Sequence, residues 1–195
     1  MSTNSNVAAT SSSSIPADDP RRNLVHARSD DRDLPHIGLV GDTYTVLLAG
    51  RFCLIDMHVP PGGGPPPHRH DFEETFVVLD GGNELTFRGV SSVAGTGETV
   101  LVPANAPHQF TNKSGRPARL LCICSPAGQE EFFAQVGVPV ATRTTAPPKL
   151  DAAAEAEFRA KVAALAAKYK TELLQRLDTH RANGHNSIRA LRRLA

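Results

Sequence analysis

Between about Gly38 and Ser125 the chain alternates short apolar runs with Gly, Pro and Asn. The runs are rich in Val, Leu, Ile, Thr and Phe, and they predict strands over TYTVLLA, RFCLIDMHV, ETFVVL, NELTF, ETVLV, HQFTN and ARLLCIC. The stretch Asp80-Gly81-Gly82, between two of the runs, is a hairpin signal. No helical pattern separates the runs, which argues against a sheet built of βαβ units. Short strands at even spacing therefore predict an all-β fold: a sandwich, a barrel or a jelly roll.

The pattern becomes helical after residue 127. The segment SPAGQEEFFAQVG predicts a short helix with its aromatic residues on one side and Gly137 at its C-terminal end. After a Pro/Thr linker, Asp151 is expected to cap a second helix that runs through AAAEAEFRAKVAALAAKYKTELLQRL. Spacings of three and four predict an apolar stripe that packs on the barrel or on a second subunit, formed by Phe158, Val162, Leu165, Tyr169 and Leu173.

The two ends of the chain have little apolar periodicity. Residues 1 to 35 are rich in Ser, Asn, Asp and Arg, so they lack the apolar surface that would offset the entropy of ordering. Beyond Asp178 every charge is positive, and we expect a frayed, solvated end there. The predicted organisation is a disordered tail over 1–35, a β-barrel over 36–127, a helical extension over 128–178 and a basic flexible tail over 179–195.

The composition is that of an ordinary soluble globular protein. The chain has 195 residues, 40% of them apolar and 21% charged, and a net charge of +1, which does not indicate nucleic acid or membrane as a partner. No apolar run reaches the ~20 residues of a membrane span. The N-terminal segment lacks a signal-peptide pattern, and three cysteines without CxxC argue against a disulfide scaffold, so we expect a cytoplasmic protein. Cys122 and Cys124 are expected in the core, with a metal or redox pair as the alternative.

Two histidines stand one residue apart after the Gly/Pro tract PPGGGPPP. On a strand, His68 and His70 point to the same face, because side chains alternate with period two. Glu74 shares their parity and Glu73 does not. The pattern therefore predicts that Glu74 joins the histidines and that Glu73 faces away, unless a β-bulge reverses the order.

A second segment, GETVLVPANAPHQFTN, adds His108 after a Pro-bounded loop. A lone histidine is more often a hydrogen-bonded structural residue than a ligand. An HxH pair with a same-face glutamate and a third histidine instead predicts a metal site formed by His68, His70, Glu74 and His108. Three imidazoles and one carboxylate suit one divalent transition metal ion per chain, such as Fe, Mn, Ni, Co or Zn, with room for water, substrate or O₂.

These two segments resemble the two signature motifs of the cupin superfamily. The first motif, a Gly followed by His-x-His, a Glu and another Gly, corresponds to Gly62, His68, His70, Glu74 and Gly81. The second corresponds to Gly97, Pro103, His108 and Asn112, with Asn105 where the family usually has Gly. Since Asn tolerates left-handed backbone, we expect the turn to be kept. The resemblance covers about residues 38 to 127.

The resemblance implies a double-sheet jelly-roll barrel with a metal ion in its bowl, usually as a homodimer. The later segments are similar to those of single-domain bacterial cupins of the quercetin-dioxygenase-like type. A dimer would also cover edge strands and the apolar stripe.

The expected function is that of a metal-dependent dioxygenase acting on a small phenolic, enolic or diketone-like substrate. Glu74 would be both a ligand and a base for a substrate hydroxyl. Phe72, Phe76 and Phe110 share parity with the ligands and are candidates for the pocket wall or for plain core. The alternatives are a redox-neutral metal-dependent isomerase or lyase and a non-catalytic small-molecule-binding protein, because one fold hosts many chemistries.

Overall fold

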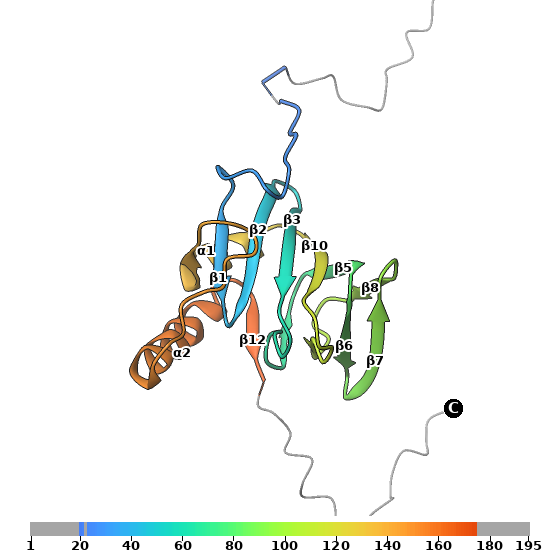
Figure 1. Ribbon diagram of the computed structural model, residues 1–195, viewed down its shortest axis with the longest axis vertical. Helices are drawn as coiled ribbons and strands as arrows, with labels where there is room; N and C mark the ends of the chain where they lie inside the picture. The colour runs from blue at the N-terminus through green and yellow to red at the C-terminus, as the bar shows by residue number, and fades with distance from the viewer. Residues whose placement is uncertain (1–19, 22, 175–195) are drawn as a thin grey trace, which may run out of the picture.

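Two antiparallel sheets packed face to face form the protein, and two helices cover one end of them (Figure 1). The computed structural model describes residues 20–21 and 23–174. The larger sheet has the order β11 (Val138–Pro139), β1 (His36–Leu39), β2 (Asp42–Ala49), β3 (Cys53–Val59), β10 (Ala118–Ser125), β5 (Glu73–Asp80) and β8 (Thr99–Val102). The smaller sheet has the order β12 (Thr171–Leu173), β4 (His68–His70), β9 (His108–Thr111), β6 (Gly82–Phe87) and β7 (Val90–Gly95). The predicted all-β, double-sheet barrel is confirmed.

The core lies between the two sheets because the strands alternate buried and exposed side chains. On β10, Leu120, Cys122 and Cys124 are buried, and the residues between them are half-buried. On β5, Phe76 and Val78 point to the same interior. Every second side chain of neighbouring strands therefore points into the same core. An ionisable side chain at such a position is buried and needs a charged or hydrogen-bonding partner.

The segment that carries the first two histidines and Glu74 is not one strand. β4 ends at His70 in the smaller sheet, and β5 begins at Glu73 in the larger sheet, after a bend at Asp71 and Phe72. The alternation of burial nevertheless continues across the bend, so that Glu74 is buried and Glu73 is exposed. The predicted side of Glu74 was right, but Glu74 reaches the histidines from the larger sheet, across the space between the two sheets.

The predicted hairpin at Asp80-Gly81-Gly82 is wrong. β5 pairs with β10 and β8, whereas β6 pairs with β7 and β9 in the other sheet. The tripeptide is therefore a crossing between the sheets. Gly81 has φ +79°, and a Cβ there would lie 3.0 Å from the Cα of Ala118, so this crossing requires glycine.

Both predicted helices begin where the sequence places them. α1 (Gln129–Val136) ends at Gly137, whose N–H donates to the carbonyl of Phe133. Gly137 has extended backbone and is needed for space, since a Cβ would lie 2.4 Å from Cγ2 of Ile37. α2 (Ala152–Ala166) is capped by Asp151, whose carboxylate accepts a 2.9 Å hydrogen bond from the N–H of Ala154.

The sequence predicted that the second helix runs to Leu177, and this prediction is wrong. α2 ends at Ala166, the chain turns, and Lys170 takes φ +53° before β12 begins. β12 pairs with the histidine strand β4, and this ladder is flanked by hydrogen bonds from Asp71 N to Lys170 O and from Leu174 N to Pro67 O. Local periodicity cannot report a free sheet edge about 100 residues away, which is why the sequence prediction failed here.

The apolar stripe packs mainly against the first helix and the barrel. Val162 and Tyr169 are buried, and the rings of Tyr169 and Phe132 lie 5.5 Å apart. Phe158 and Leu165 are partly buried against the core, whereas Leu173 is exposed. Of the two expected uses of the stripe, packing on the barrel is the one seen within this chain.

The predicted tails lie largely outside the described residues. In the described part of residues 1–35, Ser29 accepts a hydrogen bond from Arg119 and Asp30 pairs with Arg143, so this part contacts the larger sheet and the linker. The basic segment 179–195 lies wholly outside the described residues. In the described part of the chain, no helix is long and apolar enough to cross a membrane. The tail assignments, the domain bounds and the homodimer stay predictions.

The pairing of β12 with β4 predicts different outcomes for two truncations. A chain ending after Lys170 lacks β12, so β4 keeps only β9 as a neighbour, through the pair His68 and His108. We expect it to melt at a lower temperature and to bind metal at least ~10-fold more weakly, as when partners that orient ligands are lost. Metal content after dialysis and thermal unfolding measure both effects.

A chain ending after Leu174 is the matched control, because it keeps the whole β12 ladder. It should match the full chain in metal content and melting temperature. If the two truncated chains behave alike, β12 does not support the histidine strand.

Candidate metal centre

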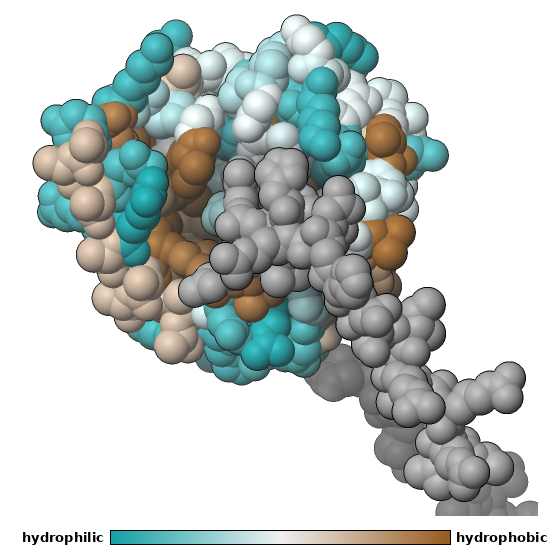
Figure 2. All heavy atoms as spheres, turned by 90° about the horizontal axis from the view of Figure 1, so that it is seen from below, coloured by the Kyte–Doolittle hydropathy of each residue, from teal (hydrophilic) through white to brown (hydrophobic). Residues whose placement is uncertain are grey.

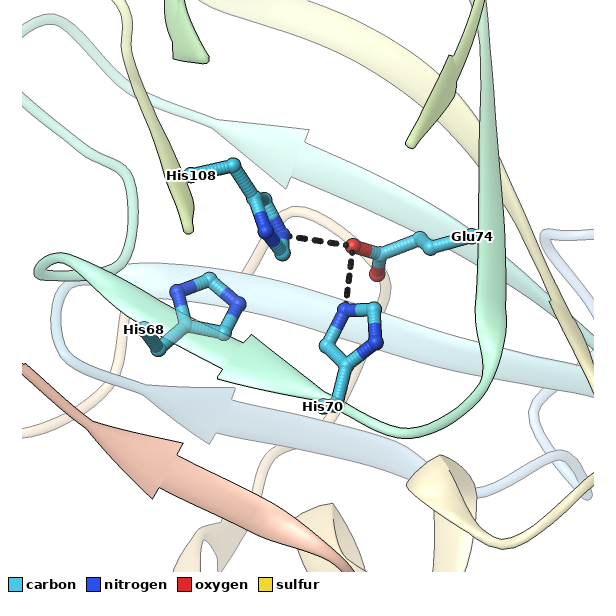
Figure 3. Close-up of side chains that lie close together, drawn as sticks. All are labelled: His68, His70, Glu74 and His108. Carbon is cyan, nitrogen blue, oxygen red and sulfur yellow. Dashed lines mark hydrogen bonds and ion pairs between the residues drawn. The ribbon is translucent and has the colours of Figure 1, made fainter. Parts of the chain in front are cut away.

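Four buried side chains converge between the two sheets, and they are the four that the sequence predicts (Figure 3). His68 and His70 come from β4, His108 opens β9, and Glu74 comes from β5. One ligand atom from each lies within 4.8 Å of all the others. Glu74 Oε2 lies 3.2 Å from Nε2 of both His70 and His108. The donor set fits a divalent transition metal ion, because imidazole nitrogen and carboxylate oxygen are the usual ligands of such ions.

Each imidazole is fixed by its own backbone. The three Nδ1 atoms lie 2.8–3.0 Å from carbonyl oxygens two residues away, in the pairs His68–Pro66, His70–Phe72 and His108–Ala106. Because a carbonyl only accepts, Nδ1 carries a proton in each ring, and Nε2 is the nitrogen left to face the cluster. The backbone therefore sets the tautomer in which Nε2 can bind a metal.

The electrostatics of the centre suit a cation. Burial, aided by the charge of His108, lowers the pKa of His68 to about 4, so this imidazole is neutral at pH 7. Burial alone would raise the pKa of Glu74, but hydrogen bonds from His108 and His70 outweigh it and hold that pKa well below its usual range. Burial also acts to lower the pKa of His108, and its contact with Glu74 raises it instead. Glu74 is therefore ionised at neutral pH, and its negative charge favours a cation bound among the four side chains.

The neighbours of the ligands point away or serve the backbone. Arg69 is exposed and pairs with Glu172 on β12, at 2.6 Å from Nε to Oε2. Asn105 takes φ +66°, and its N–H donates to the carbonyl of His70 at 2.6 Å, so the expected turn is kept. Asn112 donates to the carbonyls of Val59 and Arg116 and joins the loops around the centre.

Cys122 and Cys124 are buried in the core, as predicted, but they also contact Glu74. Sγ of Cys122 lies 3.2 Å and Sγ of Cys124 3.8 Å from Oε1, the oxygen that does not face the imidazoles. The contact with Cys124 acts to lower the pKa of Cys122, but burial and the negative charge of Glu74 raise it to about 12. The sequence could not show this contact, since it depends on the register of β10 against β5.

The centre opens into a cavity of about 810 Å³. His68 and Glu74 lie in its wall, which is otherwise mainly apolar and includes Tyr44, Met57, Phe132, Phe133, Phe158 and Val162. Seen from below, the surface is hollowed, and apolar side chains gather in the visible part of the hollow (Figure 2). Residues of α1, α2 and β12 thus complete the wall of a pocket that the other strands alone would leave open.

The three phenylalanines proposed for the pocket occupy different places. Phe110 is the one among them that lines the cavity in the described chain. Phe72 stacks on His70, with ring centroids 3.8 Å apart, and Phe76 packs edge-on against Phe110 at 5.3 Å. Phe72 and Phe76 thus match the alternative expectation, plain core, and Phe110 lies in the cavity wall. The sequence prediction missed the part of the wall that the two helices supply. The aromatic side of the first helix could be predicted from the sequence, but the surface that it packs against could not.

Tyr44 is a cavity residue that sequence reasoning missed. Its ring stacks on Phe133 at 4.7 Å, and its hydroxyl donates to Oδ2 of Asp42 at 2.9 Å. Asp42 is buried, and burial raises its pKa to about 7 against the opposing hydrogen bonds from Tyr44 and the backbone of Gly64. Near neutral pH the fold therefore holds a carboxyl group that is only partly ionised.

Residues 55–124 match the family model of the cupin domain. Similar solved structures are KdgF from Halomonas sp. (15% identity, 47% of this chain and 84% of that chain, TM-score 0.44) and a RmlC-like cupin from Shewanella frigidimarina (17%, 53% and 99%, TM-score 0.45). A sugar phosphate isomerase of the cupin superfamily from Silicibacter pomeroyi is also similar (21%, 51% and 76%, TM-score 0.46). No curated protein matches the chain. Likeness at this level indicates nothing about activity, and the quercetin-dioxygenase-like subtype stays a prediction.

Separate replacement of Glu73 and Glu74 should show which of the two adjacent glutamates binds the metal ion. Glu74→Ala removes the anionic member of the set and should weaken metal binding by at least ~10–100-fold, the loss seen for partners outside the ligand set. Glu73→Ala removes an exposed carboxylate and should change the free energy of unfolding by no more than ~0.5 kcal/mol. Metal content after identical dialysis tests this, and an empty site in Glu73→Ala with a full one in Glu74→Ala would refute the assignment.

The buried carboxyl of Asp42 predicts a pH-dependent gain in stability for Asp42→Asn. Its pKa is about 7 in the folded chain and near 3.8 when exposed. Between these pH values the folded state keeps a proton that the unfolded state loses, so the free energy of unfolding falls as pH rises. Asn cannot ionise, and its advantage should grow between pH 4 and pH 8 to roughly 4 kcal/mol at most.

Urea unfolding of Asp42→Asn and the unmodified chain at pH 5 and pH 8 measures that difference. A stability difference that is the same at both pH values would show that Asp42 does not titrate in this range.

Proposed function

We propose that this protein is a metal-dependent dioxygenase that acts on a small phenolic, enolic or diketone-like substrate. One observation carries the proposal: the four-residue ligand cluster lies in the wall of a largely apolar cavity, through His68 and Glu74. Four protein ligands on a six-coordinate ion would leave two positions, enough for one oxygen of the substrate and for O₂. The cavity supplies a shaped, mainly apolar space beside those positions.

The residues around the proposed metal ion would have three roles: binding the ion, orienting its ligands and accepting a proton. A divalent ion held by His68, His70, Glu74 and His108 would supply Lewis acidity and a template for the reactants. The backbone carbonyls at Nδ1 keep the imidazoles oriented, so the geometry is set before the substrate enters. Glu74 lines the cavity and would accept the proton of a substrate hydroxyl that binds beside it.

The composition of the wall supports an apolar substrate body. Tyr44, Phe110, Phe132, Phe133 and Phe158 present aromatic surface to the cavity, and Met57 and Val162 add aliphatic surface. A carbohydrate or a small hydroxy acid would leave its hydroxyl groups without partners on such a wall, at a cost for each buried polar group. The charged residues of the lining carry both signs: Lys149 and Lys161 stand with Glu157, and Arg159 pairs with Glu155.

The test combines metal analysis with oxygen uptake. Protein purified without added metal is analysed for Fe, Mn, Ni, Co and Zn and then assayed, in air and under argon, with diketones and enols that carry either phenyl or methyl groups. We expect O₂ consumption in step with loss of substrate, higher kcat/KM for the phenyl compounds, and no turnover under argon. Glu74→Ala should abolish the uptake, and Glu73→Ala should keep it.

Two results would replace this proposal. Equal turnover with and without O₂ would indicate a redox-neutral isomerase or lyase that uses the same ligands. No turnover of any chelating compound at full metal loading would indicate a protein that binds small molecules without converting them.

A further inference from the structure

The two oxygens of Glu74 face different partners. Oε2 lies 3.2 Å from Nε2 of both His70 and His108, inside the ligand cluster. Oε1 lies on the other side, 3.2 Å from Sγ of Cys122 and 3.8 Å from Sγ of Cys124. An ionised carboxylate only accepts hydrogen bonds, so the thiol of Cys122 is the donor to Oε1.

The thiols are held in place by the strand that carries them. β10 pairs with β3 on one side and β5 on the other, and Cys124 is the direct partner of Glu74 in that register. Cys122 and Cys124 are two apart, so their side chains share the inner face, with their sulfurs 3.5 Å apart. Both residues are fully buried. A paired, buried strand therefore holds a hydrogen-bond donor at a fixed place behind the carboxylate.

We propose that Cys122 is a positioning residue that holds Oε1 of Glu74 away from the histidines, so that the carboxylate offers Oε2 alone to a metal ion. A carboxylate that binds through one oxygen leaves one more coordination position open than a carboxylate that binds through both. The inference rests on metal binding by the four ligands proposed above, and it does not depend on which reaction follows.

Cys53 provides the comparison that separates positioning from packing. It is as buried as Cys122 and belongs to the same cluster of thiols, but its hydrogen-bonding neighbours are Cys124 and Glu130. Loss of its sulfur leaves a void of the same kind, so Cys53→Ala carries the packing cost without removing a contact with Glu74. An effect that is specific to Cys122 then reports the contact with Glu74.

The geometry also defines a competing role. Ligand atoms of Glu74, Cys122 and Cys124 lie within 4.8 Å of one another, and thiolates bind soft metal ions. If Cys122 were itself a ligand, a bound cobalt ion would show sulfur-to-metal charge transfer, which a hydrogen-bonded thiol does not produce. The two roles therefore differ in a spectrum and not only in affinity.

The experiment is a Co²⁺ titration of metal-free protein, followed by calorimetry and by absorption spectroscopy. It compares the unmodified chain with Cys122→Ala, Cys122→Val, Cys122→Ser and Cys53→Ala. Cys122→Ala and Cys122→Val should bind Co²⁺ about 10-fold more weakly, the low end of losses for a partner behind a ligand, because a thiol is a weak donor. Their visible absorption should also weaken, as expected when Oε1 turns to the ion and the coordination number rises.

Cys122→Ser keeps a donor and should recover most of the affinity and the original spectrum, whereas Cys53→Ala should match the unmodified chain in both. Cys122→Val fills the space of the thiol and keeps the test decisive if Cys122→Ala fails to fold. The proposal is overturned if Ala and Val bind like the unmodified chain, if Ser behaves like them, or if a charge-transfer band disappears with Cys122. An unmodified chain that binds no Co²⁺ refutes the proposed metal site as well.

Discussion

A negative charge buried between two sheets is the constraint around which this protein is arranged. Glu74 is 4% exposed, and an ionised carboxylate in such a place destabilises a fold by several kcal/mol unless charged or hydrogen-bonded groups compensate for it. The compensation comes from both sheets: His70 and His108 from the smaller one, and the thiol of Cys122 from the larger one. The contacts of Glu74 thus join the two sheets through polar groups inside an otherwise apolar core.

The strength of the sequence prediction lay in short spacings. His68, His70 and Glu74 were assigned from parity, and the burial of Glu74 against the exposure of Glu73 agrees, although a bend divides the segment. Asn105 was expected to keep a left-handed turn and does so at φ +66°. These features follow from local backbone geometry, which a few consecutive residues determine.

What the sequence could not predict depends on register between distant segments. β12 looks like the end of an amphipathic helix, and only the unpaired edge of β4 makes it a strand. The contact of Cys122 with Glu74 needs the alignment of β10 with β5, and the stacking of Tyr44 on Phe133 needs α1 to dock on the barrel. Such pairings are decided by the whole core, so propensity and periodicity carry little information about them.

The pairing of β12 with β4 also bears on the order in which parts of the site are synthesised. All four ligand residues are synthesised by position 108, whereas the strand that completes the edge beside two of them comes at 171–173, after both helices. Until residue 171 has been synthesised, β4 lacks this neighbour, and the side of the proposed metal centre that β12 lines is uncovered. A metal ion can reach the imidazoles during that interval directly from solvent. Once α2 and β12 have docked, their residues line the cavity that leads to His68 and Glu74, so a metal ion then has to pass them.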